Sequence, residues 1–284
     1  MTVQATVLCE NAVYNRPGVA EHGWSVWIET PSGSYLFDTG QGKGLLSNAE
    51  TYGIDLRQAQ AVMLSHHHYD HTGGLRDALG VICGPGGREE VNVYAHPDLF
   101  KDSFSIHDGH RPRHIGVPFA RSVLEAAGAC FDLSREWRAI GDRVYLSGEV
   151  PRHTPYETGD TALYHYDAAG ELVLDPIVDD QTVVIDTDQG LFVILGCSHA
   201  GLINILDHIM AKTGKRHFHT IIGGTHLGPV REDQVRQTIA ALQQYDIDHL
   251  GVSHCTGQVV AARLLHVFGE RFFFCNVGQQ VIVG

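Results

Sequence analysis

The chain has 284 residues, with 33 acidic against 20 basic side chains and a formal net charge of −13 when histidine is neutral. A chain this acidic does not suit general binding to a phosphate backbone, so nucleic acid is not an expected partner. The sequence has no run of 18 uninterrupted apolar residues, so no membrane span is expected either.

The apolar share of 43% is typical of a globular protein with a sizeable core, and we expect a single domain over residues 1–284. The six cysteines are scattered without a CxxC pair, and the first ten residues resemble a strand rather than a signal peptide. Both features favour a cytoplasmic protein. The composition leaves a homo-oligomer open.

In chain order, the first third alternates strands and turns. Residues 2–9, 24–29 and 35–37 have the pattern of strands, and the turn at 31–34 predicts a hairpin of the last two. Residues 61–65 form a short apolar run, which is typical of a strand buried on both faces.

A helix is predicted to follow this strand, from residue 72 or 73 to residue 79. The stretch near 96–121 is then irregular and locally basic, and its cationic and imidazole groups are Lys101, His107, His110, Arg111, Arg113, His114 and Arg121. Loops this long are uncommon unless they are functional. An ordinary solvated surface loop is the alternative.

The last third repeats strand then helix. The pattern predicts strands at 182–187, 191–195, 217–222, 247–252 and 272–275, and helices at 202–212, 231–245 and 259–268. Strand-rich halves that are each followed by helices predict stacked sheets covered by helices. The acidic pairs Asp179-Asp180 and Asp186/Asp188 lie near strand ends, and we interpret them as surface turns.

The strongest local signal is a histidine-rich segment directly after the apolar run at 61–65. The chain holds 19 histidines, and four of them fall within residues 66–71. In an extended segment, side chains two apart lie on the same side, so His66 and His68 point together and can bind one cation. His67 and Tyr69 alternate the other way, and we interpret them as non-ligands.

The chain then turns into the predicted helix, which directs Asp70 and His71 at a neighbouring point. Four such groups side by side are costly without a cation to share. A solvated polar loop is the alternative, but the apolar strand before the segment should fix it in place.

Histidines also recur at the ends of three later strands. They are His199 in LFVILGCSHAG, His226 in TIIGGTHLG and His254 in HLGVSHCTG. Each follows a short apolar strand and lies near a glycine, and sites in layered α/β folds gather at the carboxyl ends of strands. A single histidine of this kind is usually structural, but three in the same context predict a shared site.

These residues resemble a known family. HHHYDH matches the His-x-His-x-Asp-His signature of the metallo-β-lactamase fold superfamily, and Phe37-Asp38-Thr39-Gly40 resembles the strand-end Asp-x-Gly that precedes it there. LSHHHYDHTGGL, GEVPRHTPYE, GCSHAGLINIL, IIGGTHL and SHCTG are similar to a subgroup that includes archaeal dihydropterin–ribofuranosylaminobenzene phosphate synthases and metal-dependent hydrolases. The resemblance runs from near residue 5 to the C-terminus.

The resemblance implies an α/β fold, an αββα sandwich of two mixed β-sheets flanked by helices, with one or two metal ions at the sheet edge. It implies that His66 and His68 ligate the first metal, that Asp70 and His71 ligate the second, and that His254 is the last histidine of the site. Zinc fits an imidazole-rich site, and iron and manganese accept the same nitrogen and oxygen donors.

The sequence departs from the family pattern in two places. The family's third ligand of the first metal is a histidine in a Gly-His turn, for which the nearest candidate by position is His153. Gly196-Cys197 stands in place of the usual bridging aspartate, so His199 is a candidate for the missing imidazole. Cys197 is either a thiolate ligand or a small buried residue. Asp38 is interpreted as positioning the histidine segment.

Such a metal polarises a substrate oxygen and makes hydroxide available near neutral pH. We therefore predict a hydrolase for an ester, lactone or phosphoester in a small, anionic or phosphorylated molecule. Asp70 would orient the water or bind the second metal, His226 would contact substrate or leaving group, and Arg152 would bind an anionic group. The alternatives are a pterin-related synthase that releases diphosphate and a non-catalytic metal-holding or ligand-sensing protein.

Overall fold

The computed structural model describes residues 1–107 and 111–284 as two stacked β-sheets with helices on both outer faces. The first sheet has the strand order β18-β1-β2-β3-β4-β5-β8. Its strands are β1 (Val3–Cys9), β2 (Ser25–Thr30), β3 (Gly33–Phe37), β4 (Ala59–Met63), β5 (Val91–Ala95), β8 (Ala129–Leu133) and β18 (Gln280–Val283). The predicted αββα sandwich is confirmed.

The second sheet has the strand order β17-β16-β15-β14-β13-β10-β9. Its strands are β9 (Arg138–Gly141), β10 (Val144–Leu146), β13 (Val183–Thr187), β14 (Gly190–Ile194), β15 (His217–Gly224), β16 (Asp246–Ser253) and β17 (Phe272–Phe274). Both sheets mix parallel and antiparallel pairs, since β3 and β4 run parallel whereas β2 and β3 form the predicted hairpin.

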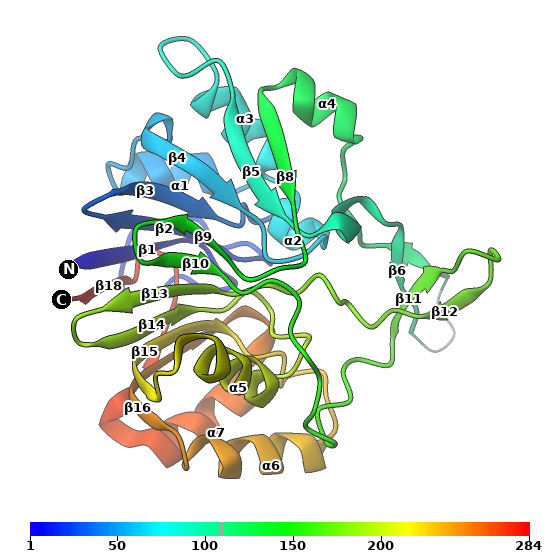
Figure 1. Cartoon of the computed structure of the whole chain (residues 1–284), viewed down its shortest axis with the longest axis vertical. Coiled ribbons are helices and arrows are strands. Elements are labelled where there is room, and N and C mark those ends of the chain that lie inside the picture. Colours follow the sequence, from blue (N-terminus) through cyan, green and yellow to red (C-terminus); the bar gives the residue numbers. More distant parts are fainter. Residues whose placement is uncertain (108–110) are drawn as a thin grey trace.

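Helices cover the outer face of each sheet (Figure 1). On the first sheet these are α1 (Leu45–Thr51), α3 (Leu75–Ile82) and α4 (Arg121–Ala126), and on the second α5 (Leu202–Thr213), α6 (Glu232–Leu242) and α7 (Gln258–Phe268). Four short 3₁₀ turns lie at Leu56–Gln58, Pro97–Phe100, His254–Thr256 and Gly269–Arg271. Each helix within the described residues is too short or too polar to cross a lipid bilayer.

The central core lies between the two sheets. Trp24, Phe37 and Phe192 are fully buried there, and β-branched residues of both sheets such as Val26 and Ile185 pack around them. Because a strand points alternate side chains to opposite faces, one side of each sheet packs on the other sheet and the other side packs on helices.

The strand ends explain why the candidate residues meet. β3 and β4 run parallel, and so do β14, β15 and β16. Parallel neighbours end at the same edge of a sheet, so the loops that follow β3, β4, β14, β15 and β16 converge at one edge of the sandwich. Each of these loops carries one or more of the predicted site residues.

A third, small sheet lies to one side of the sandwich, with the strand order β12-β11-β6-β7. Its strands are β6 (Ser103–Ser105), β7 (Arg113–His114), β11 (Leu163–Tyr166) and β12 (Leu172–Leu174). The stretch near 96–121 is therefore partly ordered into strands, because residues far along the chain supply β11 as a partner for β6. His110 lies outside the described residues.

The predicted helix at 72–79 is divided in the structure. α2 (Tyr69–Thr72) and α3 are separated by Gly73 and Gly74. A Cβ atom on Gly74 would lie 2.2 Å from the Thr39 carbonyl oxygen and 3.1 Å from the Gly42 Cα. The missing side chain lets the loop after β3 approach the histidine segment at this point.

This close approach makes Gly74→Ala a test of the packing. The new methyl group meets backbone that cannot move freely, so we expect a loss of about 1–3 kcal/mol of unfolding free energy. The matched control is Gly80→Ala in α3, where a Cβ meets no atom within 4 Å and should stabilise the helix by up to about 1 kcal/mol. Urea unfolding of both variants measures the difference, and equal effects would contradict it.

Candidate metal centre

Three imidazoles meet at the converging strand ends. The ring centroids of His66 and His68 lie 4.5 Å apart, and the His199 centroid lies 4.8 and 4.9 Å from them. The Nε2 atoms of all three rings are buried and have no hydrogen-bond partner among the described residues. Buried polar atoms are normally paired, so three unpaired nitrogen atoms in one cluster fit a bound cation.

The protonation states of these three histidines suit metal ligation. Burial, reinforced by the neighbouring imidazoles, lowers the pKa of His66 and His199 well below its ordinary value. Burial likewise lowers the pKa of His68 to about 3. At neutral pH all three rings are therefore uncharged, which is the form that binds metals.

A second group of ligand atoms lies beside the first. An Asp70 carboxylate oxygen is 3.3 Å from His254 Nε2 and 3.1 Å from His22 Nε2. His71 Nε2 is 3.3 Å from His254 Nε2. Two imidazole nitrogens this close share a proton in the metal-free protein, and a metal ion bound by Asp70, His71 and His254 would replace that proton. His22 was not identified from the sequence, where nothing distinguishes it from other loop histidines.

Carboxylates and an amide orient these ligands. The Asp38 carboxylate accepts a hydrogen bond from His71 Nδ1 at 2.7 Å and two more from Ser65, so His71 turns Nε2 toward the site. Burial lowers the pKa of His71, but the Asp38 charge outweighs burial and raises it to about 9. His254 Nδ1 lies 3.0 Å from the Asn11 amide oxygen. The structure thus supports the interpretation that Asp38 positions the histidine segment.

Cys197 lies between the two groups. Its Sγ is 3.2 Å from His71 Nε2. Sγ falls within 4.8 Å of the ligand atoms of His66 and His199, and also within 4.8 Å of those of His71 and His254. One thiolate can therefore reach both candidate metal positions, where the family pattern has an aspartate.

Two candidates from the sequence do not line this cluster. His153 is exposed, and its backbone N–H donates to the Asn204 side chain, so it is not the third ligand of the first metal. The His199 ring lies beside His66 and His68 instead. The Arg152 guanidinium donates to the carbonyl oxygens of Pro176 and Ile177, the latter at 2.9 Å. Its contact with a substrate stays a prediction.

His226 packs directly on the site without joining either group. Its ring centroid is 4.0 Å from that of His199, and both of its ring nitrogens are buried without a hydrogen-bond partner among the described residues. The Asp160 carboxylate lies 3.7 Å from Nε2. Burial lowers the pKa of His226, but the nearby Asp160 carboxylate and Cys255 thiol outweigh burial and raise it to about 9.

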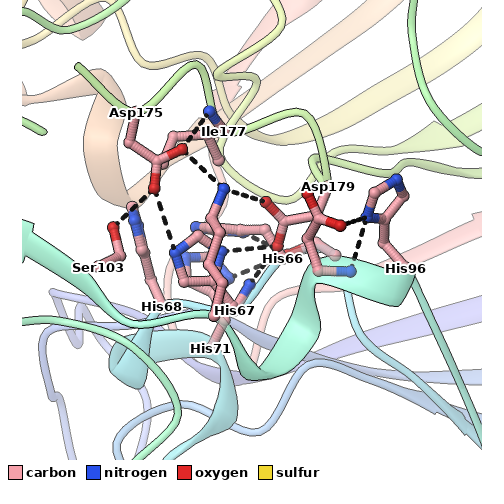
Figure 2. A network of polar contacts seen from close by, with 12 residues as sticks. His66, His67, His68, His71, His96, Ser103, Asp175, Ile177 and Asp179 are labelled. Atoms are coloured by element: carbon pink, nitrogen blue, oxygen red, sulfur yellow. Dashed lines mark hydrogen bonds and ion pairs between the residues drawn. The ribbon is translucent and has the colours of Figure 1, made fainter. Parts of the chain in front are cut away.

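The interpretation of Asp179 and Asp180 as surface turns is wrong, because both side chains are buried. Asp179 accepts hydrogen bonds from His67, between the two ligands His66 and His68 (Figure 2). Burial raises the pKa of Asp179, but His67 and Lys101 outweigh burial and lower it below the ordinary value. The structure turns Nδ1 of His67 toward Asp179, a partner for which sequence reasoning had no signal.

The backbone around the site is strained at several strand ends. Asp38, Ser198, His226 and His254 all have positive φ, at 56°, 64°, 49° and 51°. Non-glycine residues rarely adopt this region, and such outliers persist only where surrounding contacts hold them. The strain turns each side chain from the strand direction toward the shared edge.

Fold and site together define an αββα protein with clusters of potential metal ligands at one edge of the sandwich. The chain belongs to the metallo-beta-lactamase superfamily, whose family model matches residues 18–203. It is 28% identical over 283 residues to the 7,8-dihydropterin-6-methyl-4-(beta-D-ribofuranosyl)-aminobenzene-5'-phosphate synthase of Methanocaldococcus jannaschii, covering 97% of this chain and 95% of that protein.

Solved structures agree with this assignment. The structure of a metal-dependent hydrolase of the beta-lactamase superfamily is 26% identical, with a TM-score of 0.83 and 99% coverage of both chains. A diphosphatase from the PhnP family has a TM-score of 0.56 at 14% identity, with coverage of 100% of this chain and 98% of that one, and shows the shared fold alone.

The central position of Cys197 predicts that the thiolate is a ligand. Cys197→Ala should weaken metal binding by at least about tenfold and should remove the sulfur-to-metal charge-transfer absorption of the Co²⁺-loaded protein. Cys130→Ala is the control, because Cys130 is exposed on β8. An unchanged spectrum in Cys197→Ala would show that the thiol is only a packing residue.

The buried neutral imidazoles predict an acid-sensitive metal-free protein. An unfolded chain protonates histidine near its ordinary pKa of 6.5, whereas the folded protein keeps His68 neutral down to about pH 3. Because the unfolded state binds more protons, the unfolding free energy should fall as the pH drops below about 6.5, by up to about 1.4 kcal/mol per pH unit for each such histidine. His71 acts oppositely, since its contribution is complete below pH 6.5 and is lost as the pH rises through about 9.

Urea unfolding of chelator-treated protein over a pH series measures this slope. His68→Asn should give a shallower decline on the acid side, because it removes one histidine that must stay neutral in the folded state. Identical slopes in the variant and the unmodified protein would contradict the protonation states assigned here.

Proposed function

We propose that the protein is a metal-dependent hydrolase that cleaves an ester, lactone or phosphoester bond of a small, anionic substrate. The observation that carries this proposal is the cluster of three unpaired imidazole nitrogens beside the Asp70–His71–His254 group. The similarity to a protein described as a metal-dependent hydrolase, at 26% identity over the whole chain, supports the same activity.

The residues present fit two metal positions. His66, His68 and His199 would hold the first ion, Asp70, His71 and His254 would hold the second, and Cys197 reaches both. Zinc suits a set of imidazoles with one thiolate and one carboxylate, and iron or manganese would accept most of the same donors. When bound, such an ion supplies Lewis acidity that polarises a substrate oxygen and makes water acidic enough to ionise near neutral pH.

The remaining chemistry belongs to the side chains of this protein. Asp70 lies at the edge of the cluster, with one carboxylate oxygen 3.1 Å from His22 Nε2 and 3.3 Å from His254 Nε2, and it can orient a water molecule or accept its proton. His226 presents two unpaired nitrogens at the opposite side, next to His199. We assign it to donate a hydrogen bond or a proton to the substrate or leaving group.

An anionic substrate group would need a cation near the site. Lys101 does not meet this need, because its ammonium group is 2.6 Å from Asp175 and is neutralised there. Arg152 uses one terminal nitrogen for two backbone carbonyls, and a guanidinium has further N–H groups that suit phosphate or carboxylate. Arg152 is therefore the candidate for anion binding.

The similarity over 97% of the chain to an enzyme named as a dihydropterin aminobenzene 5'-phosphate synthase favours a second candidate function. In a synthase or transferase of this kind, the site would hold a diphosphate leaving group and an acceptor molecule would take the place of water. A third candidate, a non-catalytic metal-holding or ligand-sensing protein, is favoured by Cys197, which replaces the bridging aspartate of the family.

The test is a comparison of bond cleavage and metal content in the same preparations. Metal-loaded protein should cleave a generic ester, lactone or phosphodiester, with a rise in rate near neutral pH. His226→Ala should lower turnover by about 100-fold or more with metal content unchanged, and the control His249→Ala, which replaces a histidine within β16 away from the site, should have no effect.

Two results would contradict the hydrolase proposal. If no such bond is cleaved but a pterin diphosphate is consumed only with an amine-bearing or aromatic co-substrate, the protein is a synthase. In that case Arg152→Ala should weaken binding of the phosphorylated ligand. If the loaded protein turns over none of these compounds and merely binds them, the non-catalytic alternative stands.

A further inference from the structure

The segment between β12 and β13, residues 175–182, contacts both of the loops that carry the ligands of the first metal position. Asp179 and Asp180 are adjacent residues of this segment, and both side chains are buried. One carboxylate faces the loop with His66 and His68, and the other faces the loop with His199. Neither carboxylate is among the ligands or catalytic groups of the proposed hydrolysis.

Asp179 holds the first loop at its centre. One carboxylate oxygen accepts hydrogen bonds from both the backbone N–H of His67, at 2.8 Å, and the His67 ring nitrogen Nδ1, at 2.7 Å (Figure 2). His67 lies between the two ligands, so fixing both its backbone and its ring fixes the direction in which His66 and His68 point. The next backbone contact, from Gln181 N–H to the Ser65 carbonyl oxygen at 2.9 Å, holds the start of the same loop.

Asp180 holds the second loop. Its carboxylate accepts a hydrogen bond from the backbone N–H of Ala200 at 3.0 Å, directly after the ligand His199. The two loops come from different sheets, because His66 follows β4 and His199 follows β14. Two neighbouring carboxylates on one short segment therefore set the distance between imidazoles that the sheets alone do not fix.

Hydrogen bonds to Asp175 hold the segment at 175–182 in place. Asp175 accepts hydrogen bonds from Lys101 Nζ at 2.6 Å, from the Ser103 hydroxyl at 2.9 Å and from the Ile177 backbone N–H at 2.9 Å. Ile177 has a φ of 46°, a conformation that a β-branched residue adopts only under constraint. Arg152 binds the carbonyl oxygen of the same residue. Ser103 of β6 and Lys101, which lies just before β6, thus support the metal site.

We propose that Asp179 and Asp180 are positioning residues that set the spacing of the three imidazoles of the first metal position, each by holding one of the two loops. The inference rests on the metal centre that the proposed function requires. It predicts that loss of either carboxylate weakens the ion held by His66, His68 and His199. The ion held by Asp70, His71 and His254 should be affected much less.

The experiment measures metal affinity and not only activity. Metal-free protein is titrated with Co²⁺ against a chromophoric chelator, and the visible spectrum of each bound ion is recorded. Asp179→Ala and Asp180→Ala should weaken one of two ions by about 10- to 100-fold and alter its spectrum. Asp179→Asn keeps an oxygen acceptor for both His67 donors, so it should recover most of the loss. The control is Asp186→Asn, which changes the charge of a carboxylate that pairs with Arg143 and Lys215 at the surface.

A partner substitution separates positioning from general loss of structure. If Asp179 acts through His67, then His67→Ala should weaken the same ion. Asp179→Ala should then cost less in the His67→Ala background than it does alone, because only the bond from the backbone N–H of residue 67 remains to be lost. Additive losses, or equal weakening of both ions, would overturn the proposal. Asp179→Asn serves as the readout if the alanine variant does not fold. The proposal would also be overturned if Asp179→Asn lowered the Co²⁺ affinity as far as His68→Ala does.

The outcomes distinguish the inference from the function on which it rests. If the unmodified protein binds no Co²⁺ at these positions, the metal centre itself is wrong. If the unmodified protein binds two ions and the Asp179 and Asp180 variants bind them with unchanged affinity and spectrum, only the positioning role fails.

Discussion

The structure depends on the burial of imidazole nitrogens that have no hydrogen-bond partner among residues 1–107 and 111–284. His66, His68 and His199 each direct one such nitrogen into the same small volume, and unpaired buried polar atoms cost free energy. The packing of the two sheets brings the strand ends that carry these histidines to a single edge, so the rest of the fold must offset this free energy. A cation would restore the lost interactions, so metal binding and the stability of this edge are linked.

Carboxylates that pair with one ring nitrogen of a histidine fix the orientation of the imidazoles in this site. Asp38 pairs with the outward nitrogen of His71, and Asp179 pairs with the ring of His67. Each pairing uses one nitrogen of a ring and so decides where the other points. The two pairings differ in consequence, since Asp38 orients a ligand directly whereas Asp179 orients a neighbour of two ligands. Some of the chain's acidic side chains, such as Asp38 and Asp179, are therefore buried beside histidines.

The central thiol distinguishes this site from the family pattern and bears on its chemistry. A thiolate is a softer donor than a carboxylate and favours zinc or other metals that bind sulfur. Cys197 reaches both candidate positions, so it can take the connecting role of the usual aspartate. The chain is similar both to a synthase and to a hydrolase over nearly its whole length, and side chains around the centre such as His226 and Arg152, rather than the fold, decide between them.

The sequence by itself determined the fold class, most strands and the residues that gather at the metal centre, because apolar periodicity and the spacing of His66, His68, Asp70 and His71 are local properties. Only the tertiary structure decided which distant groups meet them. It excluded His153 as the third ligand, brought Cys197 and His22 to the site, and buried Asp179, which the turn-rich sequence around it had placed at the surface. Those contacts join residues far apart in the chain, and local pattern carries no information about which strand ends share an edge.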